Sequence, residues 1–356
     1  MQSSRAANGG FLHTRARPEI RLLHCCARTH MDSDTIDQAR DLVSGGIDWD
    51  YLLRRAHYDR MMPLLHKHLN AVCPRAVPRT VLRVLRDRFL ANTHRGSLLA
   101  LELLRILRRL EDHGIRAVPF KGPVLAISVY GSLALQEFAD LDMFVRRTHM
   151  RATKELLLVD GFKPVQEWPS EHHFSPPSGQ FSLDVHSSFT PRSFPFRLGL
   201  DSLCKPLERV SLLARDVLSF SPEDVLLILC AHGSRHFWAR LRWLCDLSEL
   251  VLSRESMDWG VLLDQAGRLG ASRMLSVGLL ASHHVLGTPV PKEVLQATES
   301  DGTARSIAVH VSNLHLDDTP RFPQLHMNPL VIRMRERLRD RIPGYLGILW
   351  HAARRR

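Results

Sequence analysis

The chain has 356 residues, a length that suggests two or three domains. Hydrophobic residues make up 44% and charged residues 24%, as in ordinary soluble globular proteins. No run of about 18 apolar residues occurs, which excludes a membrane-spanning helix. The net charge of +11 favours a polyanionic partner, such as a nucleoside triphosphate (NTP) or a nucleic acid.

The six cysteines exclude two kinds of site. No two of them form a C-x-x-C pair, so neither a zinc ribbon nor a thiol redox motif is indicated. A chain of this length does not need disulfides to be stable. Residues 1–17 also lack the apolar run of a secretory signal. We therefore expect free or buried thiols in a cytoplasmic protein.

Hydrophobic spacing divides the chain into a tail and three folded parts, and together these predict an α+β fold. The expected parts are a disordered tail at 1–17, an N-terminal helical region at 18–92, a core at 93–200 and a C-terminal helical domain at 201–356. In the N-terminal region, apolar residues recur at helical spacing. Asp32 is the expected N-cap of one helix there, and Gly45-Gly46 is its expected end.

The core is the only part with a mixed pattern. A long helix over 79–113, with Gly114 as its C-cap, leads into it. The pattern then predicts strands at 115–120, 140–145, 172–175 and 180–186, and helices at 123–130 and 150–158. Pro176-Pro177-Ser178-Gly179 is a strong turn signal between the last two strands. These elements form a small mixed sheet with covering helices.

From Ser221 onward the pattern is helical. Ser221 is a good N-cap, followed by Pro222 at the first helical position and by two acids in the first turn. Apolar periodicity then continues to Leu252. Further helices are expected at about 258–286, 291–313 and 328–341.

Asp140 and Asp142 are the first candidate site residues. On a strand they point to the same face, opposite apolar Leu141 and Met143. Two neighbouring carboxylates repel each other unless a cation lies between them, and Mg²⁺ prefers such oxygen ligands. Two solvated acids on an exposed strand are the alternative.

Asp184 and His186 alternate with apolar residues on a second strand. Beside the first pair, Asp184 would complete a site of three carboxylates, which can hold two metal ions. His186 shares its face and could contact substrate or a carboxylate. An ordinary edge-strand acid and a surface histidine are the alternatives.

Lys121-Gly122-Pro123 lies between a predicted strand and a predicted helix. Glycine allows the backbone to approach a ligand closely, and a helix N-terminus favours phosphate. Lys121 adds a positive charge. A plain strand-to-helix turn is the alternative.

His232, His236 and Trp243 form a stripe if 222–251 is one helix, because they then lie within about 40° of each other, with Asp246 nearby. A zinc site is not indicated, since no third ligand is identified. The stripe either lines the cleft beside the core and holds nucleotide or acceptor, or it is a helix-packing face. Gly233 would allow close packing there.

Taken together, these motifs resemble the nucleotidyltransferases of the DNA polymerase beta superfamily. The order Lys121-Gly122, Asp140-Leu141-Asp142 and Asp184-Val185-His186 is most similar to an uncharacterised nucleotidyltransferase family found in bacteria. The flanking helical segments, including 48–65 and 221–246, are similar as well. The resemblance covers about residues 18–290, and it implies a nucleotidyltransferase core between helical domains.

The resemblance implies a role for each motif. Lys121 and Gly122 would hold the triphosphate of ATP or another NTP, with His186, His232 and His236 as further nucleotide contacts. Asp140, Asp142 and Asp184 would be the catalytic metal ligands for Mg²⁺ or Mn²⁺. The reaction would be transfer of a nucleoside monophosphate to a hydroxyl acceptor with release of pyrophosphate. A small molecule, peptide, sugar, protein or RNA could be the acceptor.

The chain departs from the family pattern at three positions. Pro123 has no N–H to offer phosphate, and Gln136 and Phe138 stand where relatives often have an arginine and a small polar residue. A catalytically weakened NTP-binding or regulatory protein is therefore the first alternative. In an alternative alignment, Gly131-Ser132 would be the phosphate-binding motif.

A basic RNA-binding protein is the second alternative. It rests on clusters of basic residues that could follow a phosphate backbone. The clusters contain Arg105, Arg108, Arg109, Arg146, Arg147 and Arg151.

Overall fold

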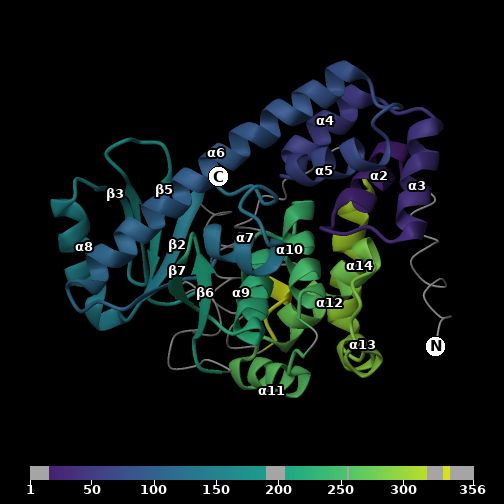
Figure 1. Cartoon of the computed structure of the whole chain (residues 1–356). Helices are drawn as coiled ribbons and strands as arrows, with labels where there is room; N and C mark the ends of the chain where they lie inside the picture. The colour runs from purple at the N-terminus through teal and green to yellow at the C-terminus, as the bar shows by residue number, and fades with distance from the viewer. Residues whose placement is uncertain (1–15, 190–204, 255, 319–331, 337–356) are drawn as a thin grey trace, which may run out of the picture.

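The computed structural model describes residues 16–189, 205–254, 256–318 and 332–336. Over these residues the fold is α+β, as expected, with helices on both sides of a small mixed sheet (Figure 1). Of the tail expected at 1–17, all but the last two residues lie outside the described part.

Four short helices precede the core, and each begins and ends for a local reason. Asp32 accepts a hydrogen bond from the Thr35 backbone N–H, and Gly45 is the C-cap of the same helix, as expected. Asp48 caps the next helix through the Tyr51 N–H. These helices are α2 (Pro18–Cys26), α3 (Ser33–Ser44), α4 (Trp49–Tyr58) and α5 (Met62–Val72).

Helix α6 (Arg79–Glu111) connects the N-terminal helices to the sheet (Figure 1). Its first turns bury Val81 and Leu85 in one core with those helices. Its last turns bury Leu103 and Ile106 in a second core, against the sheet. One continuous helix therefore passes through the expected boundary at 92–93 and fixes the sheet against the helical part.

The five-stranded sheet has the order β1-β2-β5-β4-β3. Strands β2 and β5 are parallel, and the other neighbours are antiparallel. Helices α7 (Pro123–Tyr130) and α8 (Met150–Val159) follow β1 and β2 as expected. The strands are β1 (Ala117–Pro119), β2 (Asp140–Val145), β3 (Lys163–Trp168), β4 (Glu171–Ser175) and β5 (Ser182–His186).

Three strands were not predicted from the pattern. Strand β3 is an edge strand whose residues are all exposed, so it has no buried apolar face and its sequence lacks the alternation that predicts a strand. Strands β6 (Glu208–Leu212) and β7 (Arg215–Ser219) form a hairpin. Its turn places Leu213 and Ala214 at positive φ (50° and 62°), where glycine or asparagine is the usual signal.

The expectation of a single helix over 222–251 is wrong. Helix α9 (Pro222–Arg235) stops, and α10 (Leu241–Leu252) begins after a tight turn. Phe237 and Trp238 adopt positive φ of 53° and 52°, which no α-helix can contain. Both side chains are completely buried, so their packing offsets the strained backbone.

The later helices also break where longer ones were expected. The segment 258–286 forms two helices separated by Gly270, which is in the left-handed conformation. Of 328–341, only residues 332–336 are described. The C-terminal helices are α11 (Trp259–Leu269), α12 (Ser272–Leu286), α13 (Lys292–Glu299) and α14 (Gly302–Leu316).

The N-terminal and C-terminal helices share one core. Leu52 and Leu65 belong to the same buried cluster as Leu244 and Leu275. Polar ties support this contact. The completely buried Asp59 accepts hydrogen bonds from the Leu241 N–H (3.0 Å) and from the Arg55 guanidinium (2.6 Å). The start of α10 is therefore fixed by a residue far away in the sequence.

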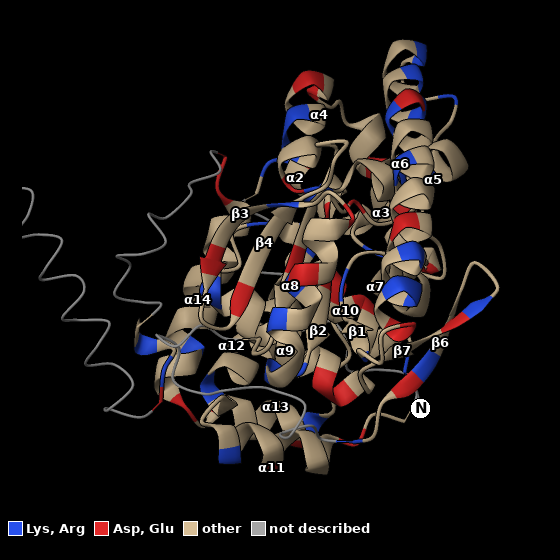
Figure 2. Ribbon diagram, turned by 90° about the vertical axis from the view of Figure 1, so that its left-hand side faces the viewer, with Lys and Arg blue, Asp and Glu red and all other residues tan. Residues whose placement is uncertain are grey.

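Basic and acidic residues both lie along α6, where arginines are the more numerous (Figure 2). Several arginines of the expected RNA-binding clusters are ion-paired. Arg105 and Arg109 both contact Asp160, at 3.2 Å each, and Arg151 contacts Glu155 at 2.8 Å. These pairs reduce the charge available to a phosphate backbone.

In the described part of the chain, no helix has both the length and the apolar character to cross a membrane. The cysteines that the structure describes are buried and free, as expected. Cys204 lies outside the described residues.

Substitution of Gly233 tests the packing of α9 against the turn that leads into α10. A Cβ at this position would lie 2.6 Å from the Trp238 ring, which is too close. We expect Gly233→Ala to lower the free energy of unfolding by about 1–3 kcal/mol in urea titrations, through overpacking. The control is Gly267→Ala in α11, where the nearest atom is 3.9 Å away and the residue is exposed. That change should raise stability by about 0.5–1 kcal/mol. Equal effects of the two changes would contradict this packing.

Candidate active site

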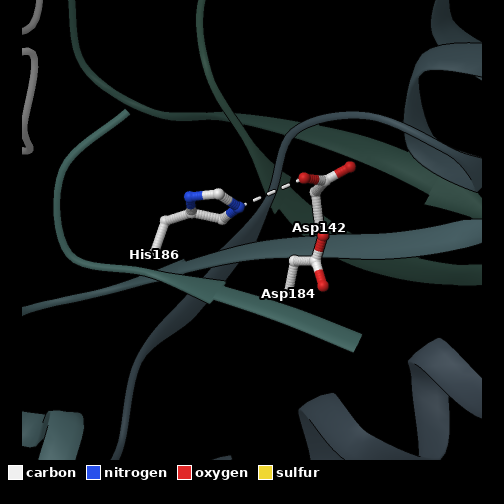
Figure 3. A group of neighbouring side chains, drawn as sticks. All are labelled: Asp142, Asp184 and His186. Atoms are coloured by element: carbon white, nitrogen blue, oxygen red, sulfur yellow. Dashed lines mark hydrogen bonds and ion pairs between the residues drawn. The ribbon is translucent and has the colours of Figure 1, made fainter. Parts of the chain in front are cut away.

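The parallel pairing of β2 and β5 brings the acidic motifs together. Asp142 is directly opposite Asp184 in the register, and Phe144 is opposite His186. The carboxylates of Asp142 and Asp184 and the imidazole of His186 place possible ligand atoms within 4.8 Å of one another (Figure 3). His186 Nε2 lies 3.2 Å from Asp142 Oδ1. The expected shared face of these residues is confirmed.

Asp140 opens β2 and lines one pocket together with Asp142. Asp140 is exposed at the start of the strand, but neighbouring protein atoms displace part of the hydration of its carboxyl group. That desolvation raises the pKa of Asp140, and the Asp142 carboxylate raises it further. Asp140 therefore lies in a field that disfavours its charge.

Lys121 and Gly122 form the turn between β1 and α7, as expected. Gly122 has φ of 56°, and a Cβ there would lie 3.3 Å from the Asp140 carbonyl oxygen, so glycine fits best. Pro123 is the first residue of α7, where a missing N–H disturbs no helical hydrogen bond. Gly131 instead ends α7 in the left-handed conformation, so Gly131-Ser132 lies at a helix C-terminus, which does not favour phosphate.

Lys121 connects the carboxylates to helix α9. Its Nζ lies 3.5 Å from Asp142 Oδ1 and 3.2 Å from His232 Nδ1. Burial opposes ionisation of Asp142, but the Lys121 ammonium and the His186 hydrogen bond outweigh it and hold the pKa of Asp142 well below its usual range. Burial, together with Lys121, lowers the pKa of His232, so this ring is neutral and accepts a hydrogen bond from the ammonium.

Asp184 has a cationic partner that the pattern did not reveal. His173 on β4 is opposite Asp184 in the register, and its Nδ1 lies 2.9 Å from Asp184 Oδ1. Its other nitrogen lies 2.8 Å from the Glu171 carboxylate. Hydrogen bonds to Asp184 and Glu171 raise the pKa of His173 to about 10. Ser182 also donates to Asp184 at 2.7 Å.

Arg242 is a second residue that sequence reasoning missed. It lines the same pocket as Asp140 and Asp142, from the first turn of α10. Its guanidinium donates to the Glu137 carbonyl, and its Nε lies 3.8 Å from Asp246. The Arg242/Asp246 spacing of four residues is a signal for such a pair, but only once α10 is known to start at Leu241.

Gln136 stabilises the wall of the pocket through a hydrogen bond to Asp246. Its amide donates to the buried Asp246 carboxylate at 2.6 Å, and the Tyr130 hydroxyl donates to the same oxygen at 2.6 Å. These bonds join α7 to α10. The guanidinium expected at position 136 is absent, but Arg242 brings one into the same pocket from another element.

The histidine stripe keeps its neighbours although the helix breaks. The ring centroids of His232 and His236 are 4.6 Å apart, and Trp243 lies 5.6 Å from the first and 5.2 Å from the second. His232 and Trp243 line the pocket. Asp246 lines it as well and accepts hydrogen bonds from Tyr130 and Gln136.

A divalent cation fits the residues present. Carboxylate oxygens of Asp142 and Asp184 with one imidazole nitrogen are a donor set that Mg²⁺ and Mn²⁺ accept. Like charges in register on neighbouring strands require compensating cations, a role that Lys121 and His173 fill in this structure. Asp140 extends this acidic surface at the start of β2.

The mixed sheet, with its acids on two parallel strands facing a lysine–glycine turn, has the layout of a nucleotidyltransferase core. The sequence agrees: residues 45–287 match the model of a family described as uncharacterised nucleotidyltransferases. The chain belongs to this family. No curated protein shows significant sequence similarity to it.

Three solved structures show partial likeness. The lincomycin-bound lincosamide antibiotic adenylyltransferase LnuA is 17% identical, covers 42% of this chain and 94% of its own, and has a TM-score of 0.31. The antibiotic-resistance factor ANT(2'')-Ia is 10% identical, covers 62% of this chain and 99% of its own, and has a TM-score of 0.34. An antigenic nucleotidyltransferase-like protein from Paracoccidioides brasiliensis is 14% identical, covers 57% of this chain and 96% of its own, and has a TM-score of 0.32. The family assignment rests on the sequence match.

The two acids of β2 should respond differently to neutralisation in the absence of metal. Asp142 is stabilised as an anion by Lys121 and His186, so Asp142→Asn should lower the free energy of unfolding by roughly 1–3 kcal/mol. Desolvation, and then the Asp142 carboxylate, disfavour the charge of Asp140, so Asp140→Asn should raise stability. Urea titrations at pH 7 with EDTA measure both. A shift of the midpoint in the same direction for both variants would show that these electrostatics are wrong.

Proposed function

We propose that this protein transfers a nucleoside monophosphate from an NTP to a hydroxyl acceptor, with release of pyrophosphate. One observation carries the proposal. Two in-register carboxylates and a histidine lie in reach of one cation, beside a turn that presents Lys121 and Gly122. Membership of the nucleotidyltransferase family supports the same reaction.

Asp140, Asp142 and Asp184 would hold Mg²⁺ or Mn²⁺, and His186 would contact Asp142 or the bound nucleotide. When bound, the metal would neutralise charge on the triphosphate and favour the ionised acceptor. The low pKa of Asp142 keeps it ionised and ready to act as a ligand. His186 and Lys121 both face that carboxylate and hold it in the ionised form.

The triphosphate would be held by residues of two elements. Gly122 allows the backbone to approach phosphate, and the Lys121 ammonium can turn from Asp142 to a phosphate oxygen. Arg242 supplies the guanidinium that position 136 lacks. The pocket therefore keeps two cationic side chains, Lys121 and Arg242, despite the departures from the family pattern at Pro123 and Gln136.

In the transfer step, the acceptor oxygen forms a bond to the α-phosphorus and the bond from that phosphorus to the α–β bridging oxygen breaks. Pyrophosphate leaves with the electron pair of the broken bond. Asp184 is the candidate for polarising the acceptor hydroxyl and taking its proton, because it is the acid on the strand beside the pair. His173 and Ser182 fix the orientation of Asp184.

A catalytically weakened NTP-binding protein is the second candidate, and one observation favours it. The acids are already satisfied by protein cations, Asp142 by Lys121 and Asp184 by His173. The pocket has a volume of only about 30 Å³, far below the roughly 300–1,000 Å³ of ordinary small-molecule sites. A nucleotide must displace Lys121 or occupy the mouth of the pocket.

Pyrophosphate release distinguishes these candidates. Purified protein is incubated with each of the four NTPs, Mg²⁺ or Mn²⁺, and host-cell extract as the acceptor source. We expect metal-dependent release, and at least a hundredfold loss in Asp140→Ala/Asp142→Ala, because removing positioned charge stabilisation costs roughly that much.

Asp264→Ala on α11, an exposed acid paired with Arg268, is the matched control and should keep full release. NTP binding without any release would favour the weakened protein. Neither binding nor release would contradict both candidates.

A further inference from the structure

An aromatic cluster lies at the edge of the pocket. His232 comes from α9, His236 caps that helix, and Trp243 belongs to the first turn of α10. The planes of His236 and Trp243 are 31° apart, and His232 meets the indole at 83°. The indole is therefore supported by one ring tilted by 31° and one nearly perpendicular ring. It is only half-buried and lines the pocket.

The position of Trp243 is fixed on both sides along the first half of α10. Asp59 holds the Leu241 N–H, two residues before Trp243. Three residues after Trp243, the buried Asp246 binds Tyr130 and Gln136. A ring held in this way loses little conformational freedom when a ligand covers it.

One cation, Lys121, lies between this cluster and the acids, and a second, Arg242, lines the same pocket. Lys121 contacts Asp142 on one side and His232 on the other. Arg242 directly precedes Trp243 in the sequence and lines the pocket that contains Asp140. The pocket thus runs from carboxylates through cations to an aromatic surface.

We propose that Trp243, supported by His236 and His232, is the platform on which the nucleobase of the NTP stacks. This inference rests on the proposed function. The groups of an NTP follow the same order as those of the pocket. Its metal-binding phosphates, at one end, match the carboxylates and cations, and its flat aromatic base, at the other end, matches the aromatic surface. Stacking tolerates every base because each has a π-face, so all four NTPs bind, and the larger purines bind more tightly.

The test compares ligands with and without a base. Dissociation constants for ATP, CTP and inorganic tripolyphosphate are measured by calorimetry with Mg²⁺ and no acceptor. Base–aromatic stacking contributes about 1–3 kcal/mol, so Trp243→Ala should weaken ATP binding roughly tenfold or more. CTP binding should weaken less, and tripolyphosphate binding should not change. Trp243→Phe should restore most of the ATP affinity.

Trp259→Ala is the matched control, because Trp259 is also half-buried but lies on α11 and does not line the pocket. It should leave all three constants unchanged. Unchanged ATP binding in Trp243→Ala, or an equal loss for ATP and tripolyphosphate, would overturn the platform. Wild-type protein that binds neither ligand would overturn the proposed function itself, and the platform with it.

Discussion

The repulsion between Asp142 and Asp184 is the constraint on which the site depends. The two carboxylates are opposite each other on neighbouring parallel strands, with Asp140 on the same face. At separations of a few ångströms, like charges in a partly buried site destabilise the fold unless cations compensate them. The contacts of Lys121 and His173 with these acids can be understood as a response to that charge.

The compensating groups come from different elements, so the site forms only when the whole fold does. Lys121 comes from the turn before α7, His173 from β4 and Arg242 from α10. Their placement needs the joint between α7 and α10, which Asp246 makes with Tyr130 and Gln136. It also needs the N-terminal helices, because Asp59 fixes the start of α10. The helical parts are thus components of the site.

Period-two alternation was enough to predict the acids and their common face. In β2, Asp140 and Asp142 alternate with Leu141 and Met143, and these two apolar residues are completely buried. The strand–turn–helix around Gly122 was predicted as well, because glycine and proline mark such turns. These signals are local, and local signals survive in a single sequence.

The residues that were missed depend on long-range packing. His173 faces Asp184 because of the register between β4 and β5, which strand alternation does not determine. Arg242 enters the pocket because the chain breaks at Phe237 and Trp238, two residues that rarely adopt positive φ. The buried Trp238 side chain fills space beside Gly233 and Gly278, a fit that only the folded chain reveals.

Binding of Mn²⁺ is the most direct test of the central claim, that the acids of β2 and β5 form a metal site for NTP. Free Mn²⁺ is measured by electron paramagnetic resonance during titration in the presence of a non-hydrolysable NTP analogue, with an analogue-only titration subtracted. We predict saturable binding to the wild-type protein and its loss in Asp142→Asn/Asp184→Asn, with Asp264→Asn unaffected. Equal binding by the wild-type and doubly substituted proteins would contradict the account.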